Sequence, residues 1–261
     1  MELARIHELG DELYRALLNR EPVAPLTERG EAIGIEEAYR ISLRLLERRI
    51  AAGASVVGKK IGITSKAVQQ MLNVHQPDFG YLTDDMMFRD GEPMPIGERL
   101  IAPRAEGEIA FILRRDLVGP GVTNADVLAA TECVMPCFEI VDSRIRDWKI
   151  RIQDTVADNA SCGFFVLGEQ AVSPRQVDLV TCGMVVEKNG SVLSTGAGAA
   201  ALGSPLNCVA WLANTLGALG TPLKAGEIIL SGSLVPLEPV RAGDEMRVSI
   251  GGIGSVSVRF T

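Results

Sequence analysis

Two stretches near the start of the chain repeat apolar residues every three or four positions. In residues 2–19 these are Leu3, Ile6, Leu9, Leu13 and Leu17, and in residues 35–53 they are Ala38, Ile41, Leu45 and Ile50. This spacing is typical of amphipathic helices. Two prolines in "EPVAPLTERG" separate the stretches, and Gly53 is a plausible stop for the second. We therefore predict an N-terminal helical region over residues 1–55.

From Val56 onward the pattern changes to short β-prone runs separated by glycines and prolines. Examples are "VVGKKIGIT", "EIAFIL", "VMPCFEIVDS", "GFFVLG" and "EIILSG", and Asn189-Gly190 predicts a hairpin. Two helices interrupt the strands, one opened by Thr123 with Asp126 three residues later, the other opened by Ser204. Strands and helices show no regular βαβ alternation, so we predict a mixed α+β domain over residues 56–261.

Three acidic residues break the apolar pattern of two predicted strands. Glu106 and Glu108 are one residue apart in "RAEGEIAFIL", so in a strand both side chains point to one face, and Glu139 lies in "VMPCFEIVDS". Carboxylates on buried strands repel one another and lose hydration. A hard divalent cation, Mg²⁺ or Mn²⁺, removes both problems, because it prefers oxygen ligands. The alternative is a solvated strand face, or glutamates paired with Arg104 and Arg144.

A second group of polar residues lies in "GKKIGITSKAVQQMLNVHQPDFGYLTDDM", residues 58–86. Lys60 belongs to a glycine-flanked strand, "SKAVQQML" predicts a short helix, and Asp78 follows Pro77 in a predicted loop. Strand, helix and loop together could bring Lys60 next to Asp78. A lysine near a metal site loses its proton more easily or stabilises a developing negative charge. A surface lysine and a turn aspartate are the alternative, and a lone histidine such as His75 is more often structural.

Two further stretches carry small polar residues or glycines. Asp158, Asn159 and Ser161 cluster before an apolar strand, where such side chains either position a ligand or form a turn. The glycine- and alanine-rich "TGAGAAALGSP" matches neither nucleotide-binding pattern, so it predicts close backbone packing or backbone approach to a small ligand.

Composition narrows the class of protein. The 261 residues are 47% hydrophobic and 23% charged, with a formal net charge of −7 and no basic cluster, so we expect no nucleic-acid partner. No apolar run approaches the roughly 20 residues that cross a bilayer, and the start lacks the apolar core of a signal peptide. The five cysteines are scattered through apolar surroundings. We therefore expect a cytoplasmic protein with reduced thiols and no membrane contact.

The stretches "RAEGEIAFIL", "FEIVDSR", "VADNAS", "GAGAAALGSPLNCVAWLAN" and "AGEIILSGS" together resemble the hydratase/decarboxylase branch of the fumarylacetoacetase-like superfamily. The resemblance covers essentially the whole chain. It implies a mixed β-roll fold, and Mg²⁺ or Mn²⁺ held by the three acids named above. It also places Lys60 and Asp78 at the reacting end of a substrate, with Ser161 and the backbone around Leu82 lining the pocket. Symmetric homo-oligomers are typical of this family.

The function that the resemblance implies is hydration of a short 2-hydroxy-dienoate in the meta-cleavage catabolism of aromatic compounds. The expected substrate is 2-hydroxypenta-2,4-dienoate and the product 4-hydroxy-2-oxopentanoate, with Lys60 and Asp78 as a proton-shuttling pair whose base is not assigned. Three alternatives use the same scaffold: a 4-oxalocrotonate decarboxylase, a non-catalytic partner subunit of such a decarboxylase, and a hydrolase of acylpyruvates. Association with a downstream aldolase or with a decarboxylase also belongs to these expectations.

Overall fold

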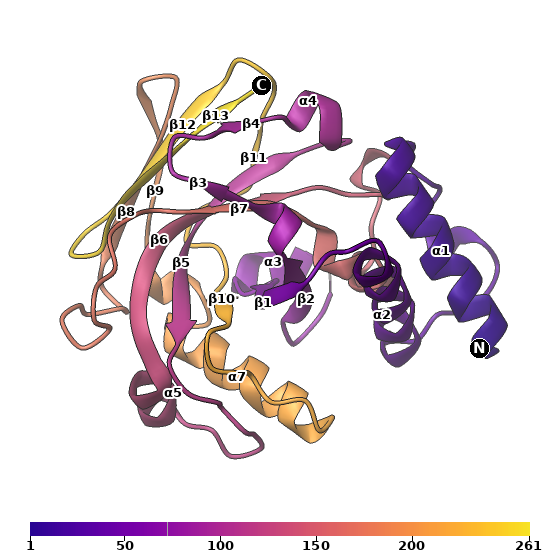
Figure 1. The fold of residues 1–261 in the computed structure, drawn as a ribbon, viewed down its shortest axis with the longest axis horizontal. Coiled ribbons are helices and arrows are strands. Elements are labelled where there is room, and N and C mark those ends of the chain that lie inside the picture. Colours follow the sequence, from indigo (N-terminus) through magenta and orange to yellow (C-terminus); the bar gives the residue numbers. More distant parts are fainter. Residues whose placement is uncertain (72) are drawn as a thin grey trace.

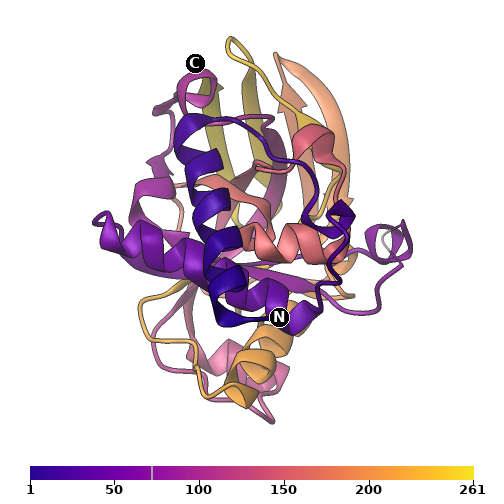
Figure 2. The same ribbon diagram turned by 90° about the vertical axis from the view of Figure 1, so that its right-hand side faces the viewer.

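The computed structural model describes residues 1–71 and 73–261 and places two long helices at the N-terminus. These are α1 (Leu3–Asn19) and α2 (Ile35–Ala51), as predicted. The buried side of α1 includes Ile6, Leu9 and Leu13, whereas Leu3 is 55% exposed. Figure 2 shows both helices on the face of the molecule that they cover.

The described residues form two sheets, and the larger has the order β2-β1-β10-β5-β6-β7-β3 with β11 paired to β5. Most neighbours are antiparallel, but β1 runs parallel to β10 and β3 parallel to β7. Its strands are β1 (Val56–Gly62), β2 (Asp78–Thr83), β3 (Met87–Arg89), β5 (Arg104–Leu113), β6 (Thr131–Val141), β7 (Cys162–Leu167), β10 (Ile228–Leu230) and β11 (Glu238–Pro239).

The smaller sheet has the order β4-β13-β12-β8-β9 and packs on one face of the larger (Figure 1). Its strands are β4 (Pro93–Met94), β8 (Gly183–Lys188), β9 (Ser191–Ala197), β12 (Glu245–Ile250) and β13 (Gly254–Phe260). The predicted hairpin joins β8 to β9, where Asn189 and Gly190 have φ values of 53° and 79°. At Gly107 of β5 the sheets approach so closely that a Cβ would lie 3.2 Å from Val248.

The described residues also form five shorter α-helices: α3 (Lys66–Met71), α4 (Ile96–Arg99), α5 (Asn124–Ala130), α6 (Ile152–Ala157) and α7 (Pro205–Ala218). The caps predicted for α5 and α7 are confirmed, because the side chains of Thr123 and Ser204 accept hydrogen bonds from Asp126 N and Leu206 N. Leu72, the last residue of the helix predicted over "SKAVQQML", lies outside the described residues. With helices and mixed sheets together, the predicted α+β class is confirmed.

The larger sheet is strongly curled, which one contact between distant strands demonstrates. Strands β1 and β6 are separated by β10 and β5, so in a flat sheet they would lie about 14 Å apart. Nevertheless Lys60 Nζ on β1 lies 3.3 Å from Glu139 Oε1 on β6. The face that carries both side chains is therefore the concave inside of a roll, visible in Figure 1 as the curve of β5, β6 and β7 around the centre.

Two apolar clusters hold these layers together. The larger fills the space between the two sheets and α7, and the smaller joins α1 and α2 to Ile145 and to Val156 and Ala157 of α6. Tyr39 of α2 also stacks on Phe79 of β2, with ring centroids 4.4 Å apart and planes inclined by 14°. The N-terminal helices thus pack directly on the strand that begins with Asp78, while the domain boundary at residue 55 stays a prediction.

One sequence prediction was wrong in this part of the chain. Asp78 is the first residue of strand β2 rather than a loop residue, since it pairs with Gly62 on β1. The preceding proline resembles a turn signal, and tertiary pairing overrides that local preference. Asp158, Asn159 and Ser161 lie in a tight turn between helix α6 and strand β7.

Replacing Gly58 by alanine should strongly destabilise the roll. A Cβ at Gly58 would overlap the carbonyl oxygen of Ile228 on the neighbouring strand β10, and backbone cannot yield as a side chain can. We expect the free energy of unfolding to fall by about 3 kcal/mol, the upper range for overpacking. Urea unfolding monitored by circular dichroism measures it. The control is Gly183→Ala, where nothing lies within 4 Å of the added carbon; equal midpoints for both variants would contradict the packing described.

Candidate metal centre and active site

The three predicted acids converge on the concave face of the roll. Glu106 on β5 lies directly opposite Glu139 on β6, and Glu108 follows two residues later on the same face. Each contributes a carboxylate oxygen to a group in which all these oxygens lie within 4.8 Å of one another. Glu108 and Glu139 are 0% and 1% exposed, and Glu106 is half-buried. The strand register alone therefore creates a cluster of three acids.

This cluster is electrostatically unfavourable without a cation. Two unit charges 4.8 Å apart repel by about 3 kcal/mol at an effective dielectric constant near 20. Burial and the neighbouring Glu139 carboxylate raise the pKa of Glu106 to about 8. Burial also raises the pKa values of Glu108 and Glu139, with repulsion from Glu139 adding to the effect on Glu108.

The described protein groups compensate only part of this charge. Lys60 Nζ lies 3.3 Å from Glu139 Oε1, and the backbone N–H of Gly232 donates to Glu108 Oε2 at 2.7 Å. Glu108 Oε1 and Glu139 Oε2 are buried and receive no hydrogen bond from any described residue. Buried polar atoms without partners are rare, so these oxygens require a ligand.

A divalent cation with oxygen ligands fits this arrangement. Three carboxylates from two adjacent strands, two of them with an oxygen that lacks a partner, form the hard donor set that Mg²⁺, Mn²⁺ and Ca²⁺ prefer. The alternative of arginine pairing is wrong. The guanidinium of Arg104 lies 4.6 Å from the centroid of the Trp148 ring, and Arg144 binds Asp158.

Lys60 and Asp78 come together around Gly62. A Cβ at Gly62 would lie 3.2 Å from Lys60 Nζ and would overlap Asp78 Oδ1, so both charged groups flank this glycine. Burial disfavours the charged form of Lys60, but the surrounding carboxylates, Glu139 foremost, raise the lysine pKa overall. Burial raises the pKa of Asp78. A cation and an acid thus stand side by side at the edge of the acid cluster.

The other two predicted pocket residues, Leu82 and Ser161, are also buried. Leu82 is 1% exposed on β2, on the same strand face as Asp78 and Gly80. Ser161 is 3% exposed, and its hydroxyl lies 3.2 Å from the hydroxyl of Thr155. His75 is exposed, unlike the acids. Substrate contacts of Leu82 and Ser161 stay predictions.

Sequence reasoning missed several residues that shape this site. Gly62 leaves the space that the side chains of Lys60 and Asp78 occupy, and Gly80 leaves room for the backbone of Asn159 and the sulfur of Cys162. Arg144 is fully buried and donates from its backbone N to Asp158 Oδ2 at 2.9 Å and from its guanidinium to Cys162 O at 2.7 Å. Arg144 belongs to "FEIVDSR" and Asp158 to "VADNAS", but the sequence does not show that these two stretches lie next to each other in space.

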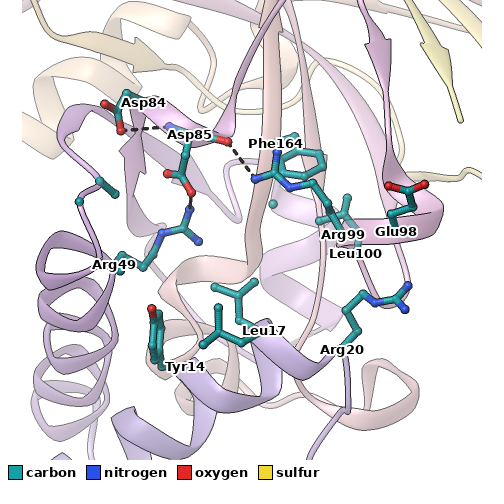
Figure 3. A pocket seen from close by; sticks show the side chains of 15 residues that line it. Tyr14, Leu17, Arg20, Arg49, Asp84, Asp85, Glu98, Arg99, Leu100 and Phe164 are labelled. Carbon is teal, nitrogen blue, oxygen red and sulfur yellow. Dashed lines mark hydrogen bonds and ion pairs between the residues drawn. The ribbon is translucent and has the colours of Figure 1, made fainter.

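A separate hollow of about 620 Å³ lies between α1, α2 and β7 (Figure 3). Among its charged lining residues, Arg49 forms an ion pair with Asp85 at 2.7 Å, and Arg99 donates to the backbone oxygen of Asp85 at 3.1 Å. The guanidinium of Arg99 also lies 4.6 Å from the centroid of the Phe164 ring. The hollow lacks a convergent set of chemical groups, so we place the active site at the acids, although they lie deeper.

The sequence of this chain is similar to those of a known protein family. Residues 51–261 match the family described as fumarylacetoacetate (FAA) hydrolase C-terminal. A 2-hydroxypent-2,4-dienoate hydratase of Pseudomonas putida is 77% identical over 220 residues, which are 84% of this chain and 99% of that protein. A 2-hydroxyhexa-2,4-dienoate hydratase of Comamonas testosteroni is 58% identical over 257 residues, covering 98% of this chain and 97% of the relative.

Solved structures show the same fold. The 4-oxalocrotonate decarboxylase from Pseudomonas putida G7, complexed with magnesium and adipate, superposes with a TM-score of 0.97 at 37% identity, covering 100% of this chain and 99% of that one. The predicted fumarylacetoacetase-like fold is thereby confirmed. Among the described residues, no helix is both long and apolar enough to cross a bilayer.

Adding Mg²⁺ should stabilise the protein through the three acids. A ligand that binds only the folded state adds about 2.7 kcal/mol at a concentration 100 times its Kd, so the melting temperature should rise by several degrees. Glu108→Gln should lose most of this rise. Without Mg²⁺ the same variant should melt no lower than the unsubstituted protein, because one repelling carboxylate is gone.

Differential scanning fluorimetry with Mg²⁺ and with EDTA makes this comparison. The control is Glu187→Gln on the half-exposed part of β8, which should keep the full response to Mg²⁺. An equal rise in melting temperature for Glu108→Gln and Glu187→Gln would remove the acids from the metal site.

Proposed function

Because the chain belongs to the fumarylacetoacetate hydrolase family, we propose that it is a hydro-lyase that adds water to 2-hydroxypenta-2,4-dienoate and forms 4-hydroxy-2-oxopentanoate. The observation that carries this proposal is the 77% identity to a hydratase named for this substrate. The site supports it chemically, since three carboxylates and an adjacent Lys60–Asp78 pair provide a cation site beside proton-transfer groups. This reaction belongs to the meta-cleavage breakdown of aromatic compounds.

Glu106, Glu108 and Glu139 would hold the metal ion, with Mg²⁺ as our first choice and Mn²⁺ as the alternative. A structure of a family relative contains magnesium, which agrees with this choice. A bound divalent cation supplies Lewis acidity toward the carboxylate and 2-oxygen of a 2-oxo acid. The acids would position the ion, because the strand register places Glu106 opposite Glu139 without any ligand.

The Lys60–Asp78 pair would move the protons of the reaction. The dienol gains a proton at C5 as its 2-hydroxyl loses one, which gives a 2-oxo-3-enoate. Water then adds its oxygen to C4 and gives up one proton to the pair, and C3 takes up one proton. Both groups are buried and flank Gly62, so they can exchange protons with one substrate chain and orient its water; which of them is the base stays open.

The alternative is a 4-oxalocrotonate decarboxylase, which the structural match at 37% identity favours. The hydratases are more similar to this chain, at 77% and 58% identity, so the hydratase is the better proposal. A non-catalytic partner subunit has no reason to retain buried acids without partners. A homo-oligomer, association with a downstream aldolase or a decarboxylase, and a cytoplasmic location stay predictions.

One assay separates these reactions. Purified protein with Mg²⁺ should remove the ultraviolet absorbance of 2-hydroxypenta-2,4-dienoate and yield a product heavier by one water, and EDTA should stop the reaction. In a parallel sample 4-oxalocrotonate should release no CO₂. Release of CO₂ from the diacid without hydration of the dienoate would replace the hydratase by the decarboxylase.

Removing either member of the proton-transfer pair should slow turnover without emptying the metal site. We expect kcat of Asp78→Asn and Lys60→Met to fall by about 10²–10⁴-fold, the range for a positioned acid or base. Isothermal titration should show that Asp78→Asn still binds Mg²⁺. His75→Ala is the control and should keep most activity, because His75 is exposed. Normal turnover by Asp78→Asn would exclude Asp78 from the chemistry.

A further inference from the structure

The curled sheet brings its first strand next to its last but one, without a backbone ladder between them among the described residues. Strand β2 is the first in the sheet order and β7 is the last but one. At Gly80 of β2, a Cβ would lie 2.8 Å from the sulfur of Cys162, the first residue of β7, and would overlap the carbonyl oxygen of Asn159. Only a glycine fits at this approach, so β2 lies directly against the turn that leads into β7.

A single side chain makes the hydrogen bonds across this junction. Asn159 Oδ1 accepts from Tyr81 N at 2.8 Å, and Asn159 Nδ2 donates to Tyr81 O at 3.0 Å. An antiparallel pair of residues exchanges the same two bonds through their backbones. The carboxamide of Asn159 therefore takes the place of a missing strand at the free edge of β2.

The turn that carries Asn159 is held in an unusual conformation. Asn159, Ala160 and Ser161 have φ values of 54°, 50° and 55°, a region that residues other than glycine rarely adopt. Buried contacts enforce it: the Arg144 guanidinium donates to Asp158 O at 2.6 Å and to Cys162 O at 2.7 Å, on either side of the turn. Asp142 N also donates to Ser161 O at 2.9 Å.

This junction lies close to the proton-transfer pair. Tyr81 follows Asp78 by three residues on the same short strand, and Asp78 faces Lys60 across Gly62. Asn159 is 1% exposed, and its carboxamide oxygen and nitrogen each bind the backbone of Tyr81.

We propose that Asn159 is a positioning residue whose carboxamide closes the roll at β2 and thereby holds Asp78 against Lys60. The effect on turnover rests on the proposed hydratase function, but the closure itself does not. We call the two hydrogen bonds between the Asn159 carboxamide and the Tyr81 backbone a clamp. Loss of this clamp should let β2 shift at its free edge, and this shift would displace Asp78 from Lys60 and alter proton transfer. The acids on β5 and β6 should keep their places, because β6 pairs with β5 at Glu106 and Glu108 and with β7 at Glu139.

A matched control exists in the same chain. Asn214 on α7 makes an equivalent clamp, accepting from Val122 N at 2.8 Å and donating to Val122 O at 2.9 Å, in a segment without predicted site residues. Asn159→Asp and Asn214→Asp each replace the donor of one clamp by a carboxylate oxygen facing a carbonyl. Asn159→Gly removes the clamp without charge and suits the positive φ at this position, so it protects against failure to fold.

The experiment measures kcat, KM, Mg²⁺ affinity, stability in urea and amide hydrogen exchange in all three variants. We expect Asn159→Asp and Asn159→Gly to lose at least about 10-fold in kcat, with KM and Mg²⁺ affinity within about 3-fold, and to exchange faster over residues 79–82. Asn214→Asp should keep kcat and the exchange of that segment, although it too loses stability in urea.

Unchanged kcat in Asn159→Gly despite faster exchange would overturn the positioning role, and unchanged exchange would overturn the closure. A kcat loss in Asn214→Asp equal to that in Asn159→Asp would show a general effect of stability and overturn the proposal as well. If the unsubstituted protein hydrates no dienoate, the proposed function fails, and the exchange over residues 79–82 still decides the closure.

Discussion

Glu106 and Glu139 face each other across two neighbouring strands, and Glu108 stands two residues further along the same buried face. The strand pairing that builds the core also forces these carboxylates together. One lysine and one backbone N–H compensate part of the charge, and two buried oxygens have no donor among the described residues. A folded chain tolerates such a cluster when a cation neutralises it. The same cation would supply the Lewis acidity of the site. The acids that destabilise the fold without a cation are therefore the ones that function requires.

The curl of the larger sheet turns this cluster into an enclosed site. It carries Lys60 across two intervening strands to Glu139, and it brings the free edge of β2 to the turn before β7. Stacking of Tyr39 on Phe79 adds support from the helical layer at the next residue after Asp78. The acids are held by the middle of the sheet and the proton-transfer pair by its edge. The metal centre thus lies on paired central strands, whereas the proton-transfer pair lies near the edge strand β2.

Local sequence patterns were sufficient for much of this fold. Helical spacing predicted α1 and α2, Asn189-Gly190 predicted the β8–β9 hairpin, and the alternation at Glu106 and Glu108 predicted a shared face. The structure also brought Lys60 to Asp78, as predicted, although Asp78 begins a strand rather than lying in a loop. The partner of Arg144 and the clamp of Asn159 on Tyr81 were not predictable. The partner of Arg144 depends on the path of the connection between β6 and β7, and the clamp of Asn159 depends on how far the sheet curls, which a sum of many non-local contacts sets.

The most direct test of the central claim is a crystal structure of the protein grown with Mn²⁺, with anomalous scattering recorded to locate the ion. We predict one strong peak on the concave face of the roll, within coordination distance of an oxygen of each of Glu106, Glu108 and Glu139. A map without a peak among these carboxylates, with their oxygens bound instead to protein cations, would contradict it.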